Sequence, residues 1–282
     1  MAKKIDWGLK FYRDVFRLDA LHFGLWQEGK PASAPANVEL SLENMRRAQE
    51  RYTRRILVTI PDGVKRILDV GCGSGSVARI LKDGGGYEIT SITPDGYQAE
   101  IFKEKNPDVD FRQVSFEDFQ NDKKYDLALF AESFQYMKNP YATLEKCQNE
   151  ILGDGGYILI SDYFRKTPQR DYYKTCHIEQ EFLDTVSRLN LTILESQDIT
   201  DAVSPTLDLG AKIYKDYALP TLEIISGYAS DKLPVSTRLL SFLLSRQLKK
   251  IRGYLYERMS DKLDSAKFRR MMTYKIYLLK KI

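Results

Sequence analysis

The sequence of 282 residues predicts an α/β fold, in which a mostly parallel sheet is covered by helices on both faces. Between residues 65 and 198, short runs rich in apolar and β-branched residues alternate with helix-forming stretches, as in a parallel sheet. One of these runs leads directly into three closely spaced glycines, and beyond residue 200 the pattern becomes helical. We therefore expect an N-terminal lid at residues 1–40, a core at 41–200 and a mainly helical cap at 201–282.

The elements follow in order along the chain. An aromatic-rich segment, Trp7 to Trp26, precedes a Pro/Ala linker, and a helix is then expected from Ser41 to Leu57 with Ser41 as its cap. Strands are expected at Arg66–Val70, Tyr87–Ile92, Asp110–Val114, Tyr125–Phe130, Gly156–Asp162 and Leu191–Asp198. Helices are expected between them, at Ser76–Leu81, Tyr97–Lys105, Asn139–Ile151 and His177–Leu189, and in the cap at Leu207–Ser230, Thr237–Asp261 and Ser265–Lys280.

The composition is that of a soluble protein with an apolar core, with 43% hydrophobic and 29% charged residues. No apolar run is long enough to span a bilayer, and the N-terminus lacks the apolar segment of a secretory signal. Cys72, Cys147 and Cys176 are odd in number and show no paired metal-ligand spacing. We therefore expect no metal site, and a reducing, cytoplasmic setting.

Positive charge is concentrated at the C-terminal end. From Arg238 to Ile282 there are 13 Lys and Arg residues against three acids, whereas the whole chain carries only +4. Between residues 240 and 252 the basic residues, which lie at 246–252, alternate with Leu and Ile at helical spacing. This pattern leaves open a solvated face or a peripheral contact with anionic lipid. No RNA-binding module is evident, so nucleic acid is not expected as a partner.

The most informative segment runs from Ile67 to Gly75, where a buried strand enters Gly71, Gly73 and Gly75 and a helix begins. Glycines allow a tight turn and let the backbone approach a ligand, while the helix N-terminus offers free N–H groups to an anion. Dinucleotide-binding enzymes use a closely related pattern, so the glycines alone do not decide the ligand.

Asp69, which stands before the first glycine in Leu-Asp-Val-Gly-Cys-Gly-Ser-Gly, sharpens the prediction. This octet resembles the signature loop of class I S-adenosylmethionine-dependent methyltransferases, and later landmarks keep the resemblance in register from about residue 40 to 200. The resemblance implies a Rossmann-like fold with a seven-stranded sheet. It also implies that Asp69 anchors the loop and the amino group of S-adenosyl-L-methionine, and that Gly71, Cys72, Gly73 and Gly75 wrap the methionine part.

The end of the second strand departs from the commonest family pattern, in which an acid holds the ribose. Here Thr93 takes the acidic position and Gln98 follows five residues later. This arrangement resembles the branch of cyclopropane fatty acid synthase, sterol, tocopherol and prenyl-diphosphate methyltransferases, which implies that Thr93 and Gln98 share the ribose contacts. Asp95 is the alternative source of a carboxylate. An acid missing from the strand end also disfavours a dehydrogenase.

Ser115 and Phe116 occupy the position expected at the edge of the adenine. The family more often carries Asp where Ser115 stands. Ser115 could make one hydrogen bond to the base and Phe116 could stack near it.

The substrate side is marked by Glu132 and Tyr136 after the fourth strand. Many family members carry Glu-x-x-x-His here, whereas Glu132 and Tyr136 resemble enzymes that methylate alkenes of prenyl chains. An alkene that accepts a methyl becomes a carbocation, which an aromatic face stabilises. A carboxylate such as Glu132 could stabilise that charge or remove a proton, or it could instead brace the loop.

The segment from His22 to Trp26 resembles the His-x-Gly-x-Trp lid of the same branch. We expect it to close over the ligands together with Tyr12, and Trp26 and Tyr217 are further candidates for substrate contact. His22 is the candidate catalytic base among the two histidines, with a structural role as the alternative.

These patterns predict an enzyme that methylates a small, largely apolar molecule, such as an isoprenoid, sterol, lipid or polyketide. The basic cap leaves room for a substrate with an anionic group. The alternatives are O- or N-methylation of a small natural product, and a non-methylating relative that binds the same cofactor.

Overall fold

The computed structural model describes residues 6–18, 20–27, 38–168, 172–232 and 261–282. The chain forms two compact units, one of residues 1–203 with 271–282 and the other of residues 204–270. Most of the predicted helix Thr237–Asp261, the basic stretch at 246–252 and the Pro/Ala linker lie outside the described residues.

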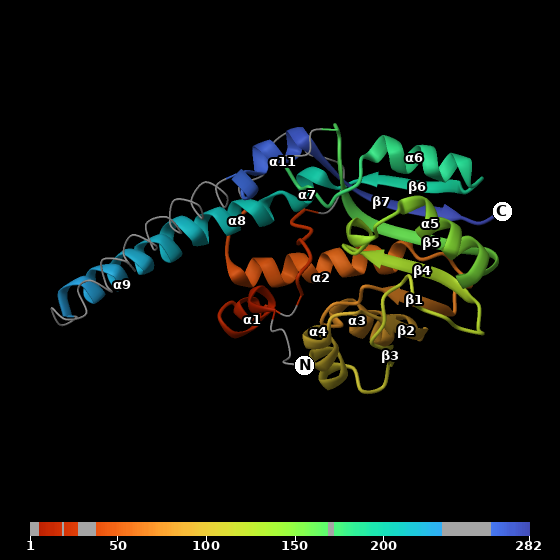
Figure 1. Ribbon diagram of the computed structural model, residues 1–282, viewed down its shortest axis with the longest axis horizontal. Helices are drawn as coiled ribbons and strands as arrows, with labels where there is room; N and C mark the ends of the chain where they lie inside the picture. The colour runs from red at the N-terminus through yellow and green to blue at the C-terminus, as the bar shows by residue number, and fades with distance from the viewer. Residues whose placement is uncertain (1–5, 19, 28–37, 169–171, 233–260) are drawn as a thin grey trace. The chain divides into compact units, whose positions relative to one another are not determined.

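The first unit is built on one seven-stranded sheet, whose strands lie in the order β3-β2-β1-β4-β5-β7-β6 (Figure 1). The strands are β1 (Arg66–Val70), β2 (Glu88–Ile92), β3 (Asp110–Arg112), β4 (Tyr125–Ala131), β5 (Leu152–Arg165), β6 (Thr192–Asp198) and β7 (Met272–Lys280). β7 runs antiparallel between β5 and β6, while β1 to β5 pair in parallel. The predicted Rossmann-like fold with a mostly parallel sheet is confirmed.

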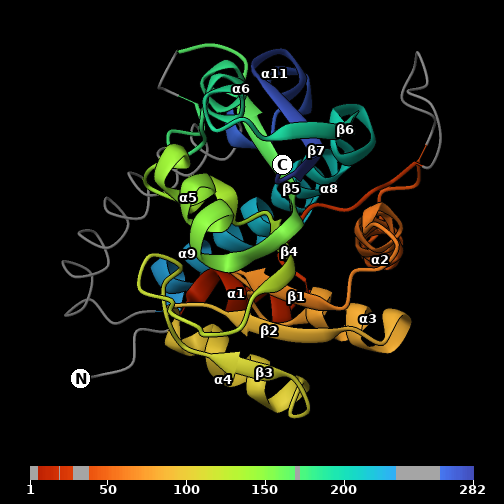
Figure 2. The same ribbon diagram turned by 90° about the vertical axis from the view of Figure 1, so that its right-hand side faces the viewer.

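Helices cover both faces of this sheet, with α2 and α3 on one face and α5 and α6 on the other (Figure 2). The helices are α1 (Trp7–Asp14), α2 (Leu42–Thr59), α3 (Ser76–Gly85), α4 (Gly96–Lys105), α5 (Pro140–Lys146), α6 (Glu179–Arg188) and α7 (Thr200–Val203). A 3-10 turn, η1 (Phe134–Tyr136), follows β4, and a π-helical turn, η2 (Cys147–Ile151), ends the stretch expected as one helix from Asn139 to Ile151.

Local sequence explains why the main helices begin where they do. Ser41 caps α2 as predicted, because its Oγ accepts the backbone N–H of Asn44 at 3.2 Å. Asp95 caps α4, and its Oδ1 accepts the N–H groups of Tyr97 and Gln98 at 2.9 and 2.8 Å. These caps fix the starts of two helices that border the carboxyl ends of β1 and β2.

The prediction of a helix from Ser265 to Lys280 is wrong. Helix α11 (Ser265–Met271) ends at Met271, and β7 follows it into the sheet between β5 and β6. Thr273, Tyr274, Ile276 and Tyr277 suit a strand because β-branched and aromatic side chains pack well on a pleated surface. Nearly all of β7 is buried, since it has a strand on each side. Residues 271–282, which were grouped with the cap, therefore belong to the sheet unit.

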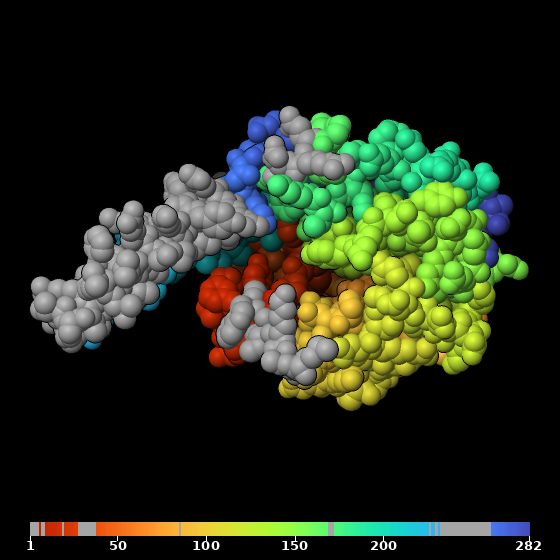
Figure 3. Space-filling model, viewed as in Figure 1, coloured from red at the N-terminus to blue at the C-terminus, as the bar shows by residue number. Residues whose placement is uncertain are grey.

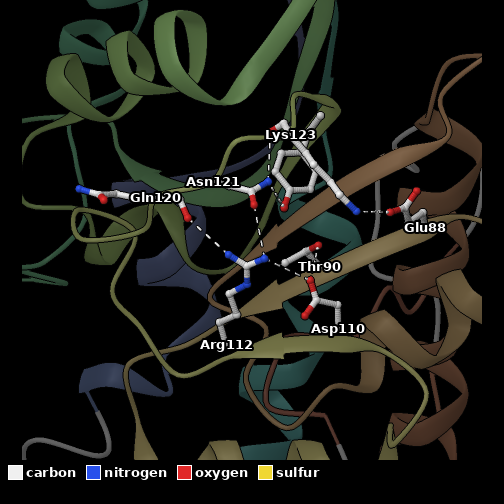
Figure 4. Close-up of polar contacts among 8 residues, drawn as sticks. Glu88, Thr90, Asp110, Arg112, Gln120, Asn121 and Lys123 are labelled. Atoms are coloured by element: carbon white, nitrogen blue, oxygen red, sulfur yellow. Dashed lines mark hydrogen bonds and ion pairs between the residues drawn. The ribbon is translucent and has the colours of Figure 1, made fainter.

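The edge of the sheet at β3 is tied to the loop that follows it (Figure 4). The Arg112 guanidinium donates to the backbone oxygen of Gln120 at 3.4 Å and to Asn121 Oδ1 at 3.3 Å. On the neighbouring strand, Thr90 Oγ1 donates to Asp110 Oδ2 at 3.0 Å. These contacts hold the loop that carries Ser115 and Phe116.

The second unit, residues 204–270, is helical where it is described. It comprises α8 (Pro205–Ile213), a π-helical turn η3 (Tyr214–Ala218), α9 (Leu219–Lys232) and most of α11. In this unit Gly210 lies close to Leu263. A β-carbon at Gly210 would lie 2.9 Å from Leu263 Cδ2, so the close approach leaves little room for a side chain at position 210. No helix among the described residues is long and apolar enough to cross a membrane.

Candidate functional site

A cavity of about 810 Å³ lies at the carboxyl ends of β1, β2 and β4, where an open parallel sheet is expected to bind its ligand. Figure 3 shows the surface hollowed where the N-terminal segment, in red, meets residues drawn in orange and yellow. The predicted site residues that line it are His22, Asp69, Gly71, Cys72, Gly73, Thr93, Asp95, Gln98, Ser115, Phe116, Glu132 and Tyr136. Residues scattered over more than a hundred positions thus meet in one space.

The three glycines of the loop have positive φ angles, but only Gly73 faces open space. A β-carbon at Gly71 would lie 2.5 Å from Ser133 Cβ, and one at Gly75 would lie 2.2 Å from Asn106 Nδ2. At Gly73, with φ of +57°, a β-carbon would meet no atom within 4 Å. Gly71 and Gly75 are therefore required for packing within the protein, whereas the space beside Gly73 is open and Gly73 lines the cavity.

Asp69 lies at the end of β1, and its side chain is buried at the floor of the cavity. Ser91 Oγ donates to Asp69 Oδ2 at 3.2 Å. Burial raises the pKa of Asp69 to about 7, although the hydrogen bond from Ser91 opposes that rise. A buried carboxyl with one hydroxyl donor retains acceptor capacity, which suits a cationic amino group.

Thr93 and Gln98 lie together beyond the end of β2, as the family resemblance implied. Thr93 Oγ1 donates to Gln98 Oε1 at 3.2 Å, and both residues line the cavity. Gln98 still has both hydrogens of its amide available as donors. Asp95 also lines the cavity, but its Oδ1 is used to cap α4.

The loop after β3 brings Ser115 and Phe116 to the same cavity. Ser115 Oγ donates to Asp118 Oδ2 at 2.7 Å, so its hydroxyl proton is already used within the loop. Phe116 is buried and packs edge-on against Phe130 at 5.6 Å between ring centroids. Ser115 therefore keeps acceptor capacity toward a ligand, and Phe116 gives the cavity an apolar wall.

Glu132 follows β4 directly and has a left-handed conformation, with φ of +53°, which is uncommon for a residue with a side chain. Its Oε1 accepts the backbone N–H of Phe23 at 2.6 Å and the hydroxyl of Tyr274 at 2.7 Å. Burial raises the pKa of Glu132 to about 8, and the negative charge of nearby Asp162 adds to the rise. Backbone strain and a perturbed carboxyl together in a cavity are typical of a functional group.

The lid segment is held firmly against α2. Gln49 Nε2 donates to the backbone oxygens of Ala20 and His22, both at 2.8 Å, and Leu25 N donates to Ala48 O at 2.8 Å. His22 and Phe23 consequently line the cavity beside Glu132.

His22 is poorly suited to be a catalytic base, which corrects one candidate role. Its Nδ1 lies 2.9 Å from the backbone oxygen of Phe23, its Nε2 lies 3.5 Å from Thr53 Oγ1, and its ring stacks on Tyr52. Burial lowers the pKa of His22 to about 4. An imidazole with so low a pKa is a weak base and removes a proton from a substrate inefficiently at neutral pH.

The other aromatic candidates lie in different places. Tyr136, on η1, lines the cavity and is 65% exposed. Trp26 is buried but does not line the cavity, and its backbone N–H donates to the backbone oxygen of Ala202 at 2.8 Å. Tyr12 is half-buried and packs on Phe16, while Tyr217 belongs to the second unit and is 66% exposed. Of these four, only Tyr136 is brought to the cavity.

Sequence reasoning missed several residues around Glu132. Tyr163, on β5, lines the cavity, and Tyr274, on β7, binds Glu132 directly, as described above. Asp162 accepts the backbone N–H of Gln135 at 2.9 Å and thereby braces η1. The signal for Tyr274 was the β-forming run at residues 272–279, which had been assigned to a helix.

Known proteins with a similar sequence decide the family. A family model described as a methyltransferase domain matches residues 42–196, more than half of the chain. This chain belongs to that methyltransferase family. The N-methyltransferase 4 of Papaver somniferum is 28% identical over 130 residues, which are 40% of this chain and 36% of the relative. The ubiquinone biosynthesis O-methyltransferase of Rickettsia felis is 35% identical over 99 residues, or 33% and 39% of the two chains.

The chain therefore spans less than two fifths of the length of these two curated relatives. A solved structure of another methyltransferase matches a much larger share of this chain than these two relatives do. It is geranyl diphosphate C-methyltransferase from Streptomyces coelicolor A3(2), in complex with Mg2+, geranyl diphosphate and S-adenosyl-L-homocysteine. Its TM-score is 0.64 at 13% identity, over 93% of this chain and 91% of that one. At this identity the likeness shows a shared fold.

Proposed function

We propose that this chain transfers a methyl group from S-adenosyl-L-methionine to a small, largely apolar molecule. The observation that carries the proposal is the open space beside Gly73, next to the buried carboxyl of Asp69 at the end of β1. The proposal includes no metal ion. Among the described residues no group of three or more His, Cys, Asp or Glu side chains is placed to hold one.

The residues of the cavity fit the parts of this cofactor. Asp69 would accept from the amino group, the loop at Gly71, Cys72 and Gly73 would hold the methionine part, and Gln98 would donate to the ribose. Gly75 lies outside the cavity lining and would serve the turn of the loop alone. Ser115 and Phe116 would lie at the base. When bound, S-adenosylmethionine supplies a methyl group activated by its sulfonium charge. The protein's task is then to orient the acceptor in line and to exclude water.

The chemistry around Glu132 favours carbon as the methylated atom. Phe23, Tyr136 and Tyr163 line the cavity beside Glu132, so a carboxyl and aromatic rings face the same space. Aromatic faces stabilise a carbocation, and a carboxylate can accept the proton that such a cation loses. Methylation of a phenol or an amine also releases a proton that a carboxylate can accept, so the aromatic rings are the feature that favours carbon.

The charges that line the cavity bear on the acceptor's head group. Among the described residues that line the cavity, Lys138 is the one Lys or Arg. The same lining contains five carboxyl groups: Asp69, Asp95, Glu117, Asp118 and Glu132. An anionic head would have to be held against this excess of acid. The described part of the cavity thus favours a neutral acceptor over a diphosphate. Membrane contact through residues 246–252 and the absence of nucleic-acid binding stay predictions.

Two other functions remain candidates on the same site. O- or N-methylation of a small natural product would use the same cofactor half, and curated relatives of this chain carry both names. A non-methylating relative would bind the cofactor and leave its methyl group in place. Counting methyl groups on the acceptor by mass spectrometry separates the last case from the others.

The test is methyl transfer from deuterium-labelled S-adenosylmethionine to isoprenoid, sterol and polyketide acceptors, followed by mass spectrometry. Wild type should add one labelled methyl group to an acceptor carbon. Glu132→Gln should lower turnover on the order of 10²-fold or more, whereas Tyr136→Phe keeps the ring face and should retain most of it. Unchanged turnover in Glu132→Gln, with cofactor still bound, would remove the support for carbon methylation.

A further inference from the structure

A chain of hydroxyl groups connects Glu132 to the interior of the sheet unit. The Tyr274 hydroxyl lies 2.7 Å from Glu132 Oε1 and 2.9 Å from the Tyr52 hydroxyl, which in turn lies 2.8 Å from Ser161 Oγ. Tyr52, Ser161 and Tyr274 are fully buried. Their three hydroxyls come from α2, β5 and β7, so the chain of contacts crosses the unit.

Each hydroxyl has one proton, and the protonation state of Glu132 therefore decides which way the protons point. When Glu132 is ionised it can only accept, so Tyr274 donates to Oε1 and Tyr52 donates to Tyr274. When Glu132 is protonated, Tyr274 can turn its proton toward Tyr52, and Tyr52 can donate to Ser161. Both arrangements leave every hydroxyl with a partner.

The two donors to Glu132 also define which of its oxygens is available. Phe23 N–H and the Tyr274 hydroxyl both reach Oε1, and Glu132 itself lines the cavity. Oε2 is thereby left as the oxygen that can meet a substrate. Phe23 offers a backbone group, so Tyr274 is the side chain that fixes this orientation.

We propose that Tyr274 is a positioning residue that orients Glu132 and favours its carboxylate form, with Tyr52 as the supporting link. This inference rests on the function proposed above. It places a required residue of the site on β7, about eighty positions beyond the residues that match the family model.

The surroundings of Glu132 explain why such a donor is needed. In the part of the chain that the structure describes, the titratable groups whose pKa is linked to that of Glu132 are neutral or acidic at neutral pH: Tyr12, Tyr52, Tyr136, Asp162, Tyr163, Tyr173, Cys176 and Tyr274. None of these groups supplies a positive charge. Hydrogen bonds from Phe23 and Tyr274 are what oppose the effect of burial on the pKa of Glu132.

Tyr274→Phe tests the inference, with Tyr277→Phe as a matched control. Tyr277 lies on the same strand and also donates to a carboxylate, Glu179 Oε1, at 2.6 Å, but it lies outside the cavity lining. Two measurements are needed: the pKa of the Glu132 carboxyl, from the infrared carboxyl bands of each protein minus those of its Glu132→Gln counterpart, and the pH profile of turnover.

In Tyr274→Phe we expect the Glu132 carboxyl and the acidic limb of the turnover profile to titrate about one pH unit higher, because a donor to the charged form is lost. Turnover at pH 7 should fall about tenfold, and cofactor affinity should stay within about twofold. Tyr277→Phe should change neither measurement. Tyr52→Phe keeps Tyr274 but removes the hydroxyl to which Tyr274 is bonded, so it should raise the pKa of the Glu132 carboxyl by less than Tyr274→Phe does.

The outcomes separate this inference from the proposed function. An unchanged carboxyl pKa in Tyr274→Phe overturns the inference, whatever happens to turnover. A raised carboxyl pKa with unchanged turnover supports the hydrogen bond and overturns the catalytic role given to Glu132. If Tyr274→Phe does not fold, Tyr52→Phe decides, and no upward shift in that variant overturns the inference.

Discussion

Gln98 and Asp95 stand within three residues of each other, and the structure gives them different tasks. Asp95 Oδ1 caps α4, whereas Gln98 is bound to Thr93 at the cavity wall. That Thr93 and Gln98 act together was implied by the family resemblance. The cap is a local signal, since an Asp before a helix is typical of that position.

This division of tasks predicts how two substitutions differ. Gln98→Ala should weaken binding of S-adenosylhomocysteine by about 1–2 kcal/mol, the loss of one or two hydrogen bonds to a partly buried ligand. Asp95→Asn removes the charge but keeps a capping oxygen, so affinity should hardly change. Calorimetry on both variants provides the measurement. Greater weakening by Asp95→Asn than by Gln98→Ala would mean that the acid, and not the amide, faces the ribose.

Glu132 should make the ligand-free protein less stable as the pH rises. Its pKa in the folded protein is about 8, above the ordinary value of 4.5, so the folded state favours the protonated form. That contribution to stability is present below about pH 4.5 and is lost as the pH rises through about 8. Gln keeps the shape and the acceptor oxygen but has no charge to bury.

Denaturant unfolding at pH 5 and pH 8 measures this effect. Between these pH values the free energy of unfolding should fall by a few kcal/mol more for wild type than for Glu132→Gln. All other titrating groups are common to both proteins, so the difference isolates Glu132. Equal pH dependence in the two proteins would show that Glu132 is not held in an unfavourable environment.

At the scale of elements, the lid segment depends on the close approach of Gly24 to α2. A β-carbon at Gly24 would lie 2.6 Å from Ala48 Cβ, and the neighbouring Leu25 N–H bonds to Ala48 O. Gly24→Ala should therefore push the segment away from α2 and lower both thermal stability and cofactor affinity. Ala48→Gly in the same protein removes the nearest clashing atom and should restore part of the loss.

Thermal unfolding and cofactor titration of the two single variants and the double variant check this prediction. A Gly24→Ala protein that binds the cofactor normally would show that the segment is not needed to shape the cavity. If the double variant is no more stable and binds the cofactor no more tightly than Gly24→Ala, the clash with Ala48 is not the cause of the loss.

The elements also show how far local patterns reach. The bounds of β1 were predicted from sequence, and those of β2, β4 and α4 within one residue, because buried apolar runs and helix starts carry their own signals. β7 was missed because its β-forming run at residues 272–279 was taken as the end of a helix, and no local pattern records that it pairs with β5 and β6. The contact between Tyr274 and Glu132 could not be foreseen for the same reason.

At the scale of the whole sheet unit, three separate parts of the chain build one site. The glycine loop follows β1, the lid segment comes from the N-terminus and Tyr274 comes from the C-terminal strand. The loop could be recognised from sequence because Gly, Asp and the strand before it are contiguous. The side of the cavity at Glu132 depends on residues that meet only after folding.

A ligand that binds this cavity should stabilise the folded state as a whole. S-adenosylhomocysteine at a concentration 100 times its Kd would raise the free energy of unfolding by about 2.7 kcal/mol. Under the function proposed above, that binding depends on the open space beside Gly73. Gly155 offers a matched control, since it has φ of +68° with nothing within 4 Å of a β-carbon, and it does not line the cavity.

Calorimetric titration of S-adenosylhomocysteine into wild type, Gly73→Val and Gly155→Val tests the central claim most directly. Both variants place a branched side chain in a left-handed backbone, so the conformational strain is shared. We expect wild type and Gly155→Val to bind and Gly73→Val to show no binding, because its side chain fills the ligand's space. Equal binding by the two variants, or binding of NAD but not of S-adenosylhomocysteine by wild type, would contradict the account.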